Sequence, residues 1–336
     1  MGHLWDSGYS VREPSWHGLA TILDSHPENW GEARKAAGLE WEVAERDLPV
    51  IDWDDNKQPH IAHDTHGHAL IDPDYKAITR SDNGKRLAIT SSTYEVISME
   101  DFGIIFESVL EEPNVKFETA GSLDEGRLVW ALAYLNEPMQ IGNDPSQTVP
   151  YLLLTSRHDG AGAAQLIPTT VRVICANTVK LAEMEGDSRG AVYSFRHTAN
   201  WRSRIKDAKE AVQGSRREFA AFREISEELY KKPVTSAQRE WFVEAFMPYP
   251  PEGTFTDRVR RNVDASRDQL RLLAYEETNE KVSSTAYGLV QMGVEYLDHI
   301  RPYRHKKSYF GRTMMTPEKQ KTRLVKLAHK ASEIRV

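Results

Sequence analysis

The sequence predicts an α+β protein, with a mainly antiparallel sheet in its first half and a largely helical second half. Apolar runs of strand length follow one another between residues 114 and 173, separated by turn residues. A helical pattern follows the last of these runs, so the expected core has a strand–strand–strand–helix order. From residue 198 onward, apolar residues recur mostly at spacings of three and four, the periodicity of helices. With 336 residues, the chain can bury a sizeable core.

The segment that precedes this core is turn-rich through residue 80, and we expect only short strands in it. A strand pair is expected from the Asn83-Gly84 turn onward, in "GKRLAITSSTYEVI". The next segment, "SMEDFGIIFESVLEE", has the pattern of a helix. Ser98 is placed to cap this helix, Asp101 to complete a capping box, and Pro113 to prevent its continuation.

The strand-like runs of the core are "NVKFETAGSL", "GRLVWALAYL", "PYLLLTSRHD" and "AAQLIPTTVRV". Asp159-Gly160 is typical of a hairpin turn between the last two. The stretch "TTVRVICANTVKLAE", residues 169–183, begins with the alternation of a strand and ends with helical spacing. Asn177 and Thr178 stand where the two patterns meet, and we expect them to cap the helix.

The second half should be built from helices. A helix of up to thirty residues is expected from residue 198 to Tyr230, before Pro233. Thr256 or Asp257 should cap a later one. The remaining helical patterns are "SAQREWFVEAFM", "TDRVRRNVDASRDQLRLLAYEE", "SSTAYGLVQMGVEYLDHI" and "PEKQKTRLVKLAHKA". We therefore divide the chain into a turn-rich segment (1–80), an α+β core (81–197) and a helical region packed on the core (198–336).

The net charge of −7 conceals a contrast between the two halves. Residues 1–150 carry 11 Lys and Arg against 27 Asp and Glu, a net charge of −16. Residues 151–336 carry 32 and 23, a net charge of +9. Such an asymmetry indicates a face that binds a polyanion, or two halves that neutralise each other.

Composition also indicates where the protein resides. No run approaches the roughly 18 apolar residues that a membrane-spanning helix needs. The start, "MGHLWDSGYSVREPSW", lacks the features of a signal peptide. A single cysteine excludes an internal disulfide. We expect a cytoplasmic protein without a membrane partner.

Two features raise the question of catalysis. His60, His63, Asp64, His66 and His68 are candidate metal ligands, but their spacing matches no established site and favours a surface hairpin turn. Cys175 could be a nucleophile, although a lone cysteine at the end of an apolar strand is more often a small buried residue. We expect no catalytic residue, metal or cofactor. An enzyme that uses the histidine-rich segment or Cys175 stays open as an alternative.

Basic residues are the stronger signal. Some lie on or beside expected strands, where a long cation must be exposed or paired. Others surround Trp201, and a last group is interleaved with aromatic residues in "RPYRHKKSYFGR", the composition of a contact with a single strand of nucleic acid. The candidate nucleic-acid-binding residues are Arg157, His158, Arg172, Arg196, Arg202, Arg204, Lys206, Arg304, Lys306, Lys307, Tyr309 and Arg312.

Eight segments follow one another along the chain: "PSWHGLA", "YKAITRSDNGKRLAITSSTYEVISMEDF", "TAGSLDEGRLVWALA", "YLLLTSRHDG", "TTVRVICANTVKLA", "FRHT", "TAYGLVQMGVEYLDHIRP" and "YFGR". In these segments and their order, the chain resembles the phage/plasmid-like protein family, the domain of unknown function nine-three-two. The resemblance implies a protein of phages, prophages or plasmids in the bacterial cytoplasm. It brings no catalytic residues with it.

The strand–strand–strand–helix order from Leu128 to Glu185 is also similar to the core of Rad52-like single-strand annealing proteins, which form rings or filaments and hold DNA in a basic groove. This likeness implies that Arg172 projects from an open sheet face, near Arg157 and His158. The alternative is that Arg172 pairs with a carboxylate such as Asp159 or Glu183.

Two non-enzymatic functions follow from these patterns. The first is single-stranded DNA binding, with annealing during recombination or replication, by a homo-oligomer. The second is a structural or host-interaction role, with self-association through the long helix that ends at Tyr230. The sequence does not decide between DNA and RNA.

Overall fold

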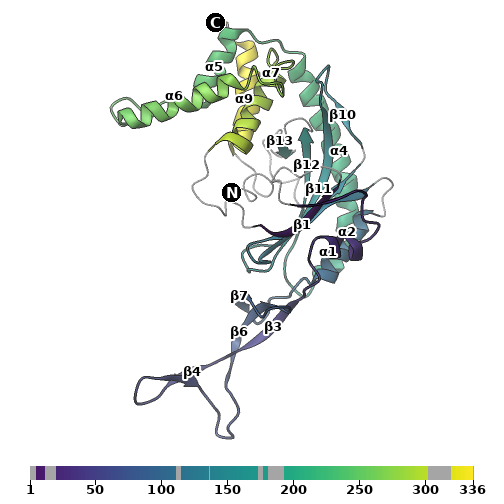
Figure 1. The fold of residues 1–336 in the computed structure, drawn as a ribbon, viewed down its shortest axis with the longest axis vertical. Helices are drawn as coiled ribbons and strands as arrows, with labels where there is room; N and C mark the ends of the chain where they lie inside the picture. Colours follow the sequence, from purple (N-terminus) through teal and green to yellow (C-terminus); the bar gives the residue numbers. More distant parts are fainter. Residues whose placement is uncertain are drawn as a thin grey trace.

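The computed structural model describes residues 5–11, 20–110, 115–135, 137–172, 177–180, 193–301 and 319–335. Only the backbone is described for residues 109–110, 171–172, 177–180, 204–213 and 319. The molecule is elongated, with a large sheet in its middle, helices at one end and a narrow β-structure at the other (Figure 1). This arrangement confirms the α+β class predicted from the sequence.

A nine-stranded sheet forms the middle of the molecule, in the order β13-β12-β11-β9-β8-β1-β2, with β10 beside β11 and β14 beside β12. Only β1 and β2 pair in parallel within it. Its strands are β1 (Trp5–Val11), β2 (Thr21–Leu23), β8 (Lys116–Leu123), β9 (Leu128–Tyr134), β10 (Met139–Gln140), β11 (Gln147–Arg157), β12 (Ala164–Arg172), β13 (Asn177–Lys180) and β14 (Tyr193–Phe195).

The strand-like runs predicted for the core are confirmed as β8, β9, β11 and β12. The turn predicted at Asp159-Gly160 joins β11 to β12, and Gly160 has a φ of +71° there. A glycine adopts this left-handed conformation without the steric cost that a side chain brings.

The end of β12 differs from the prediction. Asn177 and Thr178 do not cap a helix, because they belong to β13, which pairs antiparallel with β12 and places Asn177 opposite Arg172. The apolar residues near Asn177 and Thr178 are too few to distinguish the spacing of a helix from that of a strand. The free edge of β12 and the β-branched residues of β13 favour the sheet ladder. Cys175 and the part of the expected helix that follows Lys180 lie outside the described residues.

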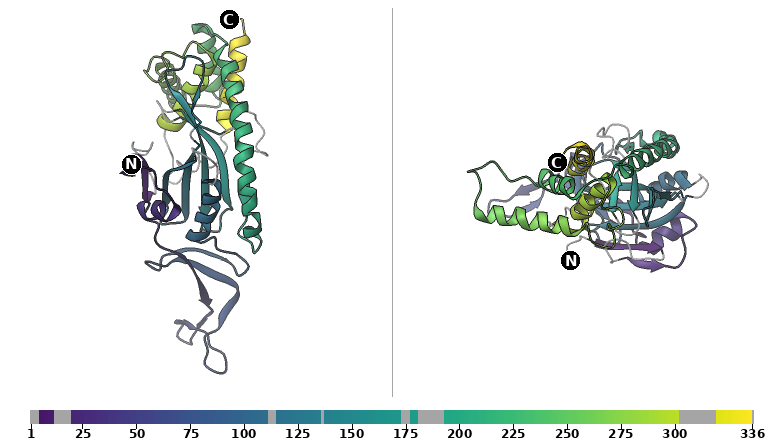
Figure 2. Two further views of the ribbon diagram at one scale, coloured as in Figure 1. Left: turned by 90° about the vertical axis from the view of Figure 1, so that its right-hand side faces the viewer. Right: turned by 90° about the horizontal axis from the view of Figure 1, so that it is seen from above.

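Helices cover one face of the sheet. They are α1 (Trp30–Ala36), α2 (Met99–Leu110), η1 (Trp201–Arg204) and the long α4 (Ile205–Tyr230), which runs along the sheet in Figure 2. Alternation along β9 places Val129, Ala131 and Ala133 in the large core beneath these helices. Leu128, Trp130 and Leu132 belong instead to a second, smaller apolar cluster.

The predicted capping box of α2 is confirmed. The Asp101 N–H donates to Ser98 Oγ at 3.0 Å, and the Ser98 N–H donates to the Asp101 carboxylate at 3.2 Å. These bonds satisfy N–H groups that have no partner inside the helix.

The end of the molecule that contains the chain's carboxyl-terminal residues is helical (Figure 1). Its elements are α5 (Ser236–Phe246), α6 (Asp257–Leu272), α7 (Ala286–Glu295), the π-helical η2 (Tyr296–Ile300) and α9 (Lys319–Glu333). Thr256, rather than Asp257, is the cap of α6. Figure 1 shows α6 projecting away from its neighbours.

The opposite end is a three-stranded sheet in the order β3-β6-β7, extended by the hairpin of β4 and β5. Its strands are β3 (Val43–Pro49), β4 (Ile51–Trp53), β5 (Pro59–Ile61), β6 (Ile71–Arg80) and β7 (Arg86–Ser91). The predicted boundary at residue 80 falls inside this sheet, because β6 and β7 pair with each other. Likewise, β1 and β2 join the central sheet although they precede that boundary.

Across the described residues, we find no helix with the length and hydropathy to span a membrane.

Candidate functional site

Three segments that lie far apart in the sequence meet where β11 ends. The phenol of Tyr94 donates to the backbone carbonyl of Arg157 at 3.1 Å, and its ring stacks on His197 with 4.6 Å between centroids. The backbone N–H of Glu95 donates to the carbonyl of His197 at 3.2 Å. The sequence-predicted residues Arg157, His158, Arg196 and Arg202 all belong to this region.

Arg157 is neutralised at this position. It is half-buried, its Nε donates to Asp159 at 3.0 Å, and its Nη2 forms an ion pair with the same carboxylate. Burial alone would raise the pKa of Asp159, but the hydrogen bonds from Arg157 and from the Ala161 N–H outweigh it and lower the pKa. Asp159, which we considered as a partner of Arg172, forms an ion pair with Arg157.

The two histidines of the region are uncharged parts of the core. His158 is 1% exposed, contacts Trp41 edge-on, and has its Nδ1 3.1 Å from the carbonyl oxygen of Gly126. Burial lowers the pKa of His158 to about 4 and also lowers the pKa of His197. His158, which we predicted to bind nucleic acid, is buried in this structure, so its ring is not part of the described surface.

Arg202 also has an acidic partner. Its side chain is 61% exposed, and its guanidinium lies 3.0 Å from Asp101 in α2 and 4.7 Å from the centre of the Trp201 ring. Arg196 is exposed. With Arg157 and Arg202 each beside an aspartate, the described part of the region is a network of alternating charges rather than a positive surface.

The side chains of the other predicted residues lie outside the described part of the structure. Only the backbones of Arg172, Arg204 and Lys206 are described, in β12, η1 and α4. The group formed by Arg304, Lys306, Lys307, Tyr309 and Arg312 lies outside the described residues.

The histidine-rich segment forms the predicted surface turn. His63 and Ala69 form an isolated bridge, and the Asp64 carboxylate accepts from the N–H groups of His66 and His68 at 2.8 and 2.9 Å. These hydrogen bonds are those of an aspartate that stabilises its own turn. Within the described ranges, no three side chains of His, Cys, Asp or Glu are grouped to hold a metal ion.

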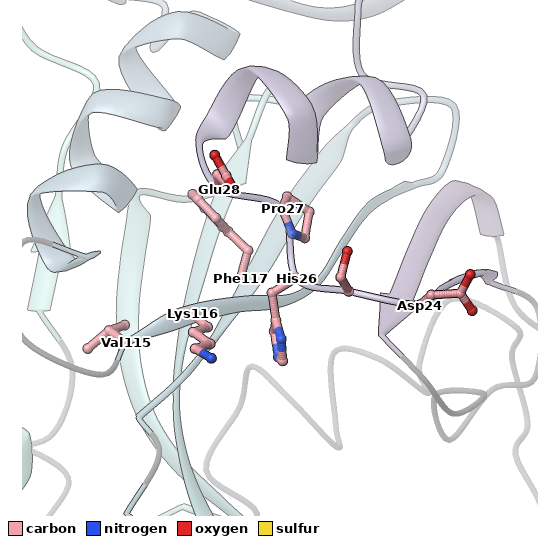
Figure 3. A pocket seen from close by; sticks show the side chains of 8 residues that line it. Asp24, His26, Pro27, Glu28, Val115, Lys116 and Phe117 are labelled. Atoms are coloured by element: carbon pink, nitrogen blue, oxygen red, sulfur yellow. The ribbon is translucent and has the colours of Figure 1, made fainter.

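A hollow that the sequence did not predict lies between residues 24–28 and the start of β8, with a volume of about 610 Å³. In Figure 3, His26 and Lys116 point to the same side of the strand. His26 Nε2 lies 2.8 Å from a Glu118 carboxylate oxygen, and its ring stacks on Tyr134. A histidine beside a carboxylate can exchange protons with a ligand. The pair alone does not define a reaction.

A second unpredicted feature is a row of exposed cations on α9. Arg323, Lys326 and Lys330 are spaced by three and four residues, so they lie on one face of the helix. No carboxylate of the described residues lies within ion-pair distance of any of the three. Lys330 lies 5.5 Å from the centre of the Trp241 ring, and Arg323 lies 5.9 Å from that of Phe246, both rings on α5. We call these three cations the basic face of α9.

The sequence contained a signal for this face. Helix α9 has five Lys and Arg against one Glu, and the basic residues of "RLVKLAHK" follow helical spacing. Its contact with aromatic rings of α5 was not predictable, because it depends on how two helices pack.

The fold and these surfaces define an elongated α+β protein with a helix-covered antiparallel sheet. The chain belongs to the family described as Domain of unknown function (DUF932), whose sequence model matches residues 86–323. The match extends from β7 into α9, so it includes the central sheet from β8 onward, the Arg157 region and, of the basic face, Arg323 but not Lys326 or Lys330. Neither the curated proteins nor the solved structures contain a match to this chain.

Proposed function

We propose that this protein binds single-stranded nucleic acid through the basic face of α9. The observation that carries the proposal is the row of Arg323, Lys326 and Lys330, exposed and without acidic partners among the described residues. Cations in a row can follow a phosphate backbone, and their binding releases condensed counterions.

The aromatic rings beneath the cations support a single strand over a duplex. Trp241 is partly exposed beside Lys330, and an indole face can stack on an unpaired base. The segment from Arg304 to Arg312, which precedes α9 in the sequence, has the composition of a single-strand contact. Annealing in phage or plasmid recombination is the biological role that we propose for this binding.

The test is the affinity of the full chain for a fluorescent single-stranded oligonucleotide at two salt concentrations. Binding should weaken steeply with salt, by about 0.7 log unit per phosphate contact for each log unit of salt. The Lys326→Gln/Lys330→Gln variant should bind more weakly and with a shallower salt slope.

The control removes the same number of exposed lysines elsewhere, as Lys35→Gln/Lys57→Gln. This variant should bind like the unaltered chain. Equal affinities for the control and the α9 variant would contradict the proposed interface. Failure of the unaltered chain to bind DNA or RNA oligonucleotides at low salt would contradict the function.

Self-association through the long helix has less support. The predicted apolar stripe of α4 includes Phe219, Phe222 and Leu229, and all three are buried in the large core. A stripe that already packs inside one chain cannot also cover another chain. Among the described side chains, the large apolar residues that are exposed all lie outside α4.

A further inference from the structure

Residues 47–75 form a projection that we call the β-arm. It contains the end of β3, the β4–β5 hairpin, the turn at His63–Ala69 and the start of β6. Backbone hydrogen bonds join Val50 to Leu70 and to Ala62, at 2.8 and 2.9 Å, and hold its two turns together. Figure 1 shows the β-arm at the end of the molecule opposite the helices.

The β-arm has regular strands but no core of its own. Every residue from Val50 to Ile61 is exposed, and Ala62 is the one buried residue of the arm. An isolated two-stranded hairpin is only marginally stable in water. The arm therefore presents ordered backbone whose side chains, apart from Ala62, are not buried by the described residues.

One side of the β4–β5 hairpin is apolar. Ile51 is directly opposite Ile61, and Trp53 is opposite Pro59, so these four residues share a face of the two-stranded ladder. Ile51, Trp53 and Ile61 are 49%, 62% and 41% exposed. A protein partner with an apolar recess can cover an exposed apolar face of this kind.

The β-arm is also strongly acidic. Residues 47–75 contain seven aspartates and one lysine, and no other Lys, Arg or Glu. The net charge with neutral histidines is therefore −6. A partner surface must offer an apolar recess together with positive charge.

The helical end of the same chain offers both. A hollow of about 290 Å³ lies beside α6, lined by Phe246, Met247, Pro248, Val259, Asn262, Val263, Ser266, Tyr296, Leu297, Arg301 and Gln320. We call it the α6 hollow. No acidic residue is among these described lining residues, and Arg301 supplies a cation. Arg258 and Arg260 are exposed on the same projecting helix.

We propose that the apolar face of the β-arm of one copy docks into the α6 hollow of a second copy. The indole of Trp53 is the anchor, since an aromatic side chain supplies a large apolar area to a recess. The aspartates of the arm then face the arginines of α6. The arm and the hollow lie at opposite ends of the molecule, so the arm cannot dock into the hollow of its own chain (Figure 1). Such a head-to-tail contact builds rings or filaments.

Sedimentation velocity of the full chain, over roughly a hundredfold range of concentration, tests the docking. The unaltered chain should associate as its concentration rises, and high salt should weaken the association by screening. The Ile51→Ser/Trp53→Ser variant should stay monomeric, and so should Val259→Asp/Val263→Asp. The matched control, Ile22→Ser/Ile104→Ser, removes exposed apolar residues outside the arm and should associate normally.

A mixture of the two defective variants tests the head-to-tail arrangement. One chain keeps its hollow and the other keeps its arm, so the mixture should form a heterodimer and stop there. Circular dichroism establishes that both variants are folded. Monomeric behaviour of the unaltered chain at every concentration would overturn the proposal. So would association of either variant, or failure of the folded variants to pair.

Discussion

The central sheet and the β-arm are both built from antiparallel strands, but different interactions keep them ordered. The central sheet has a continuous apolar core beneath α1, α2 and α4, to which Phe102, Phe106 and Phe117 contribute fully buried rings. The β-arm has backbone hydrogen bonds and turn aspartates but almost no buried side chain. Strand geometry alone therefore does not reveal what a region contributes. The first region stabilises the chain, whereas the second presents a surface.

The largest expected difference between the two regions is in how much the truncation of a side chain lowers the free energy of unfolding. Phe106→Ala removes a fully buried ring from the core and should lower the free energy of unfolding by about 3–5 kcal/mol. Ile51→Ala, in the arm, should change it by no more than about 0.5 kcal/mol. Urea unfolding at low protein concentration measures both. A similar loss in the two variants would show that the arm belongs to the cooperative core.

Replacing a glycine by alanine, which adds a methyl group, should also lower the free energy of unfolding more in the core than in the arm. Gly103 of α2 lies against Trp30 of α1 so closely that a new Cβ would be 2.0 Å from a ring carbon. Gly103→Ala should therefore cost about 3 kcal/mol of unfolding free energy. In the arm, a Cβ on Gly67 would meet nothing within 4 Å, and only its φ of +85° opposes substitution. Thermal or urea unfolding of Gly67→Ala should reveal a loss of about 1 kcal/mol. A larger loss of unfolding free energy in Gly67→Ala than in Gly103→Ala would contradict the difference in packing between the two regions.

The smallest of the three effects expected in the core concerns the charge of a buried histidine, and an exposed histidine of the β-arm serves as its counterpart. Burial lowers the pKa of His158 from its ordinary 6.5 to about 4, so between these values the unfolded chain binds a proton that the folded chain does not. Lowering the pH from about 7 to about 5 should thus remove about 2 kcal/mol of stability through this residue.

Urea unfolding at the two pH values checks this prediction with two variants. His158→Gln should lose less stability between them than the unaltered chain. His66→Gln, at an exposed position of the arm, should lose as much as the unaltered chain. His197 is also buried and contributes in the same direction, so the dependence should not vanish completely in His158→Gln. If the stability of His158→Gln depends on pH as strongly as that of the unaltered chain, the pH dependence does not come from the lowered pKa of His158.

Periodicity and turn residues were sufficient to predict much of the fold. Long patterns such as α4, the Ser98–Asp101 capping box and the Asp159-Gly160 turn are local features, and the structure contains each of them. The four residues of β13 were predicted wrongly because their element is set by pairing with β12, which no local pattern contains. β1 and β2 were not assigned to the central sheet for the same reason, because their place is set by the pairing of β1 with β8 and of β2 with β1.

The candidate site was less predictable. The sequence places Arg157 next to Asp159, but Arg202 and Asp101 are paired only because η1 packs beside the start of α2. A list of cations in a sequence does not say which of them acquire carboxylate partners. The basic face of α9 and the apolar face of the hairpin depend on spacing within one element, so a search for exposed stripes would have found both.

The position of β1 also bears on how the chain is made. Thr119 of β8 donates its hydroxyl to the carbonyl of Tyr9 in β1, across 110 positions of sequence. β1 is synthesised well before β8, its antiparallel ladder partner. Because such a distant pairing is slow to form, the edge of β1 that pairs with β8 must wait during translation, and a chaperone that shields it should raise the yield of native protein.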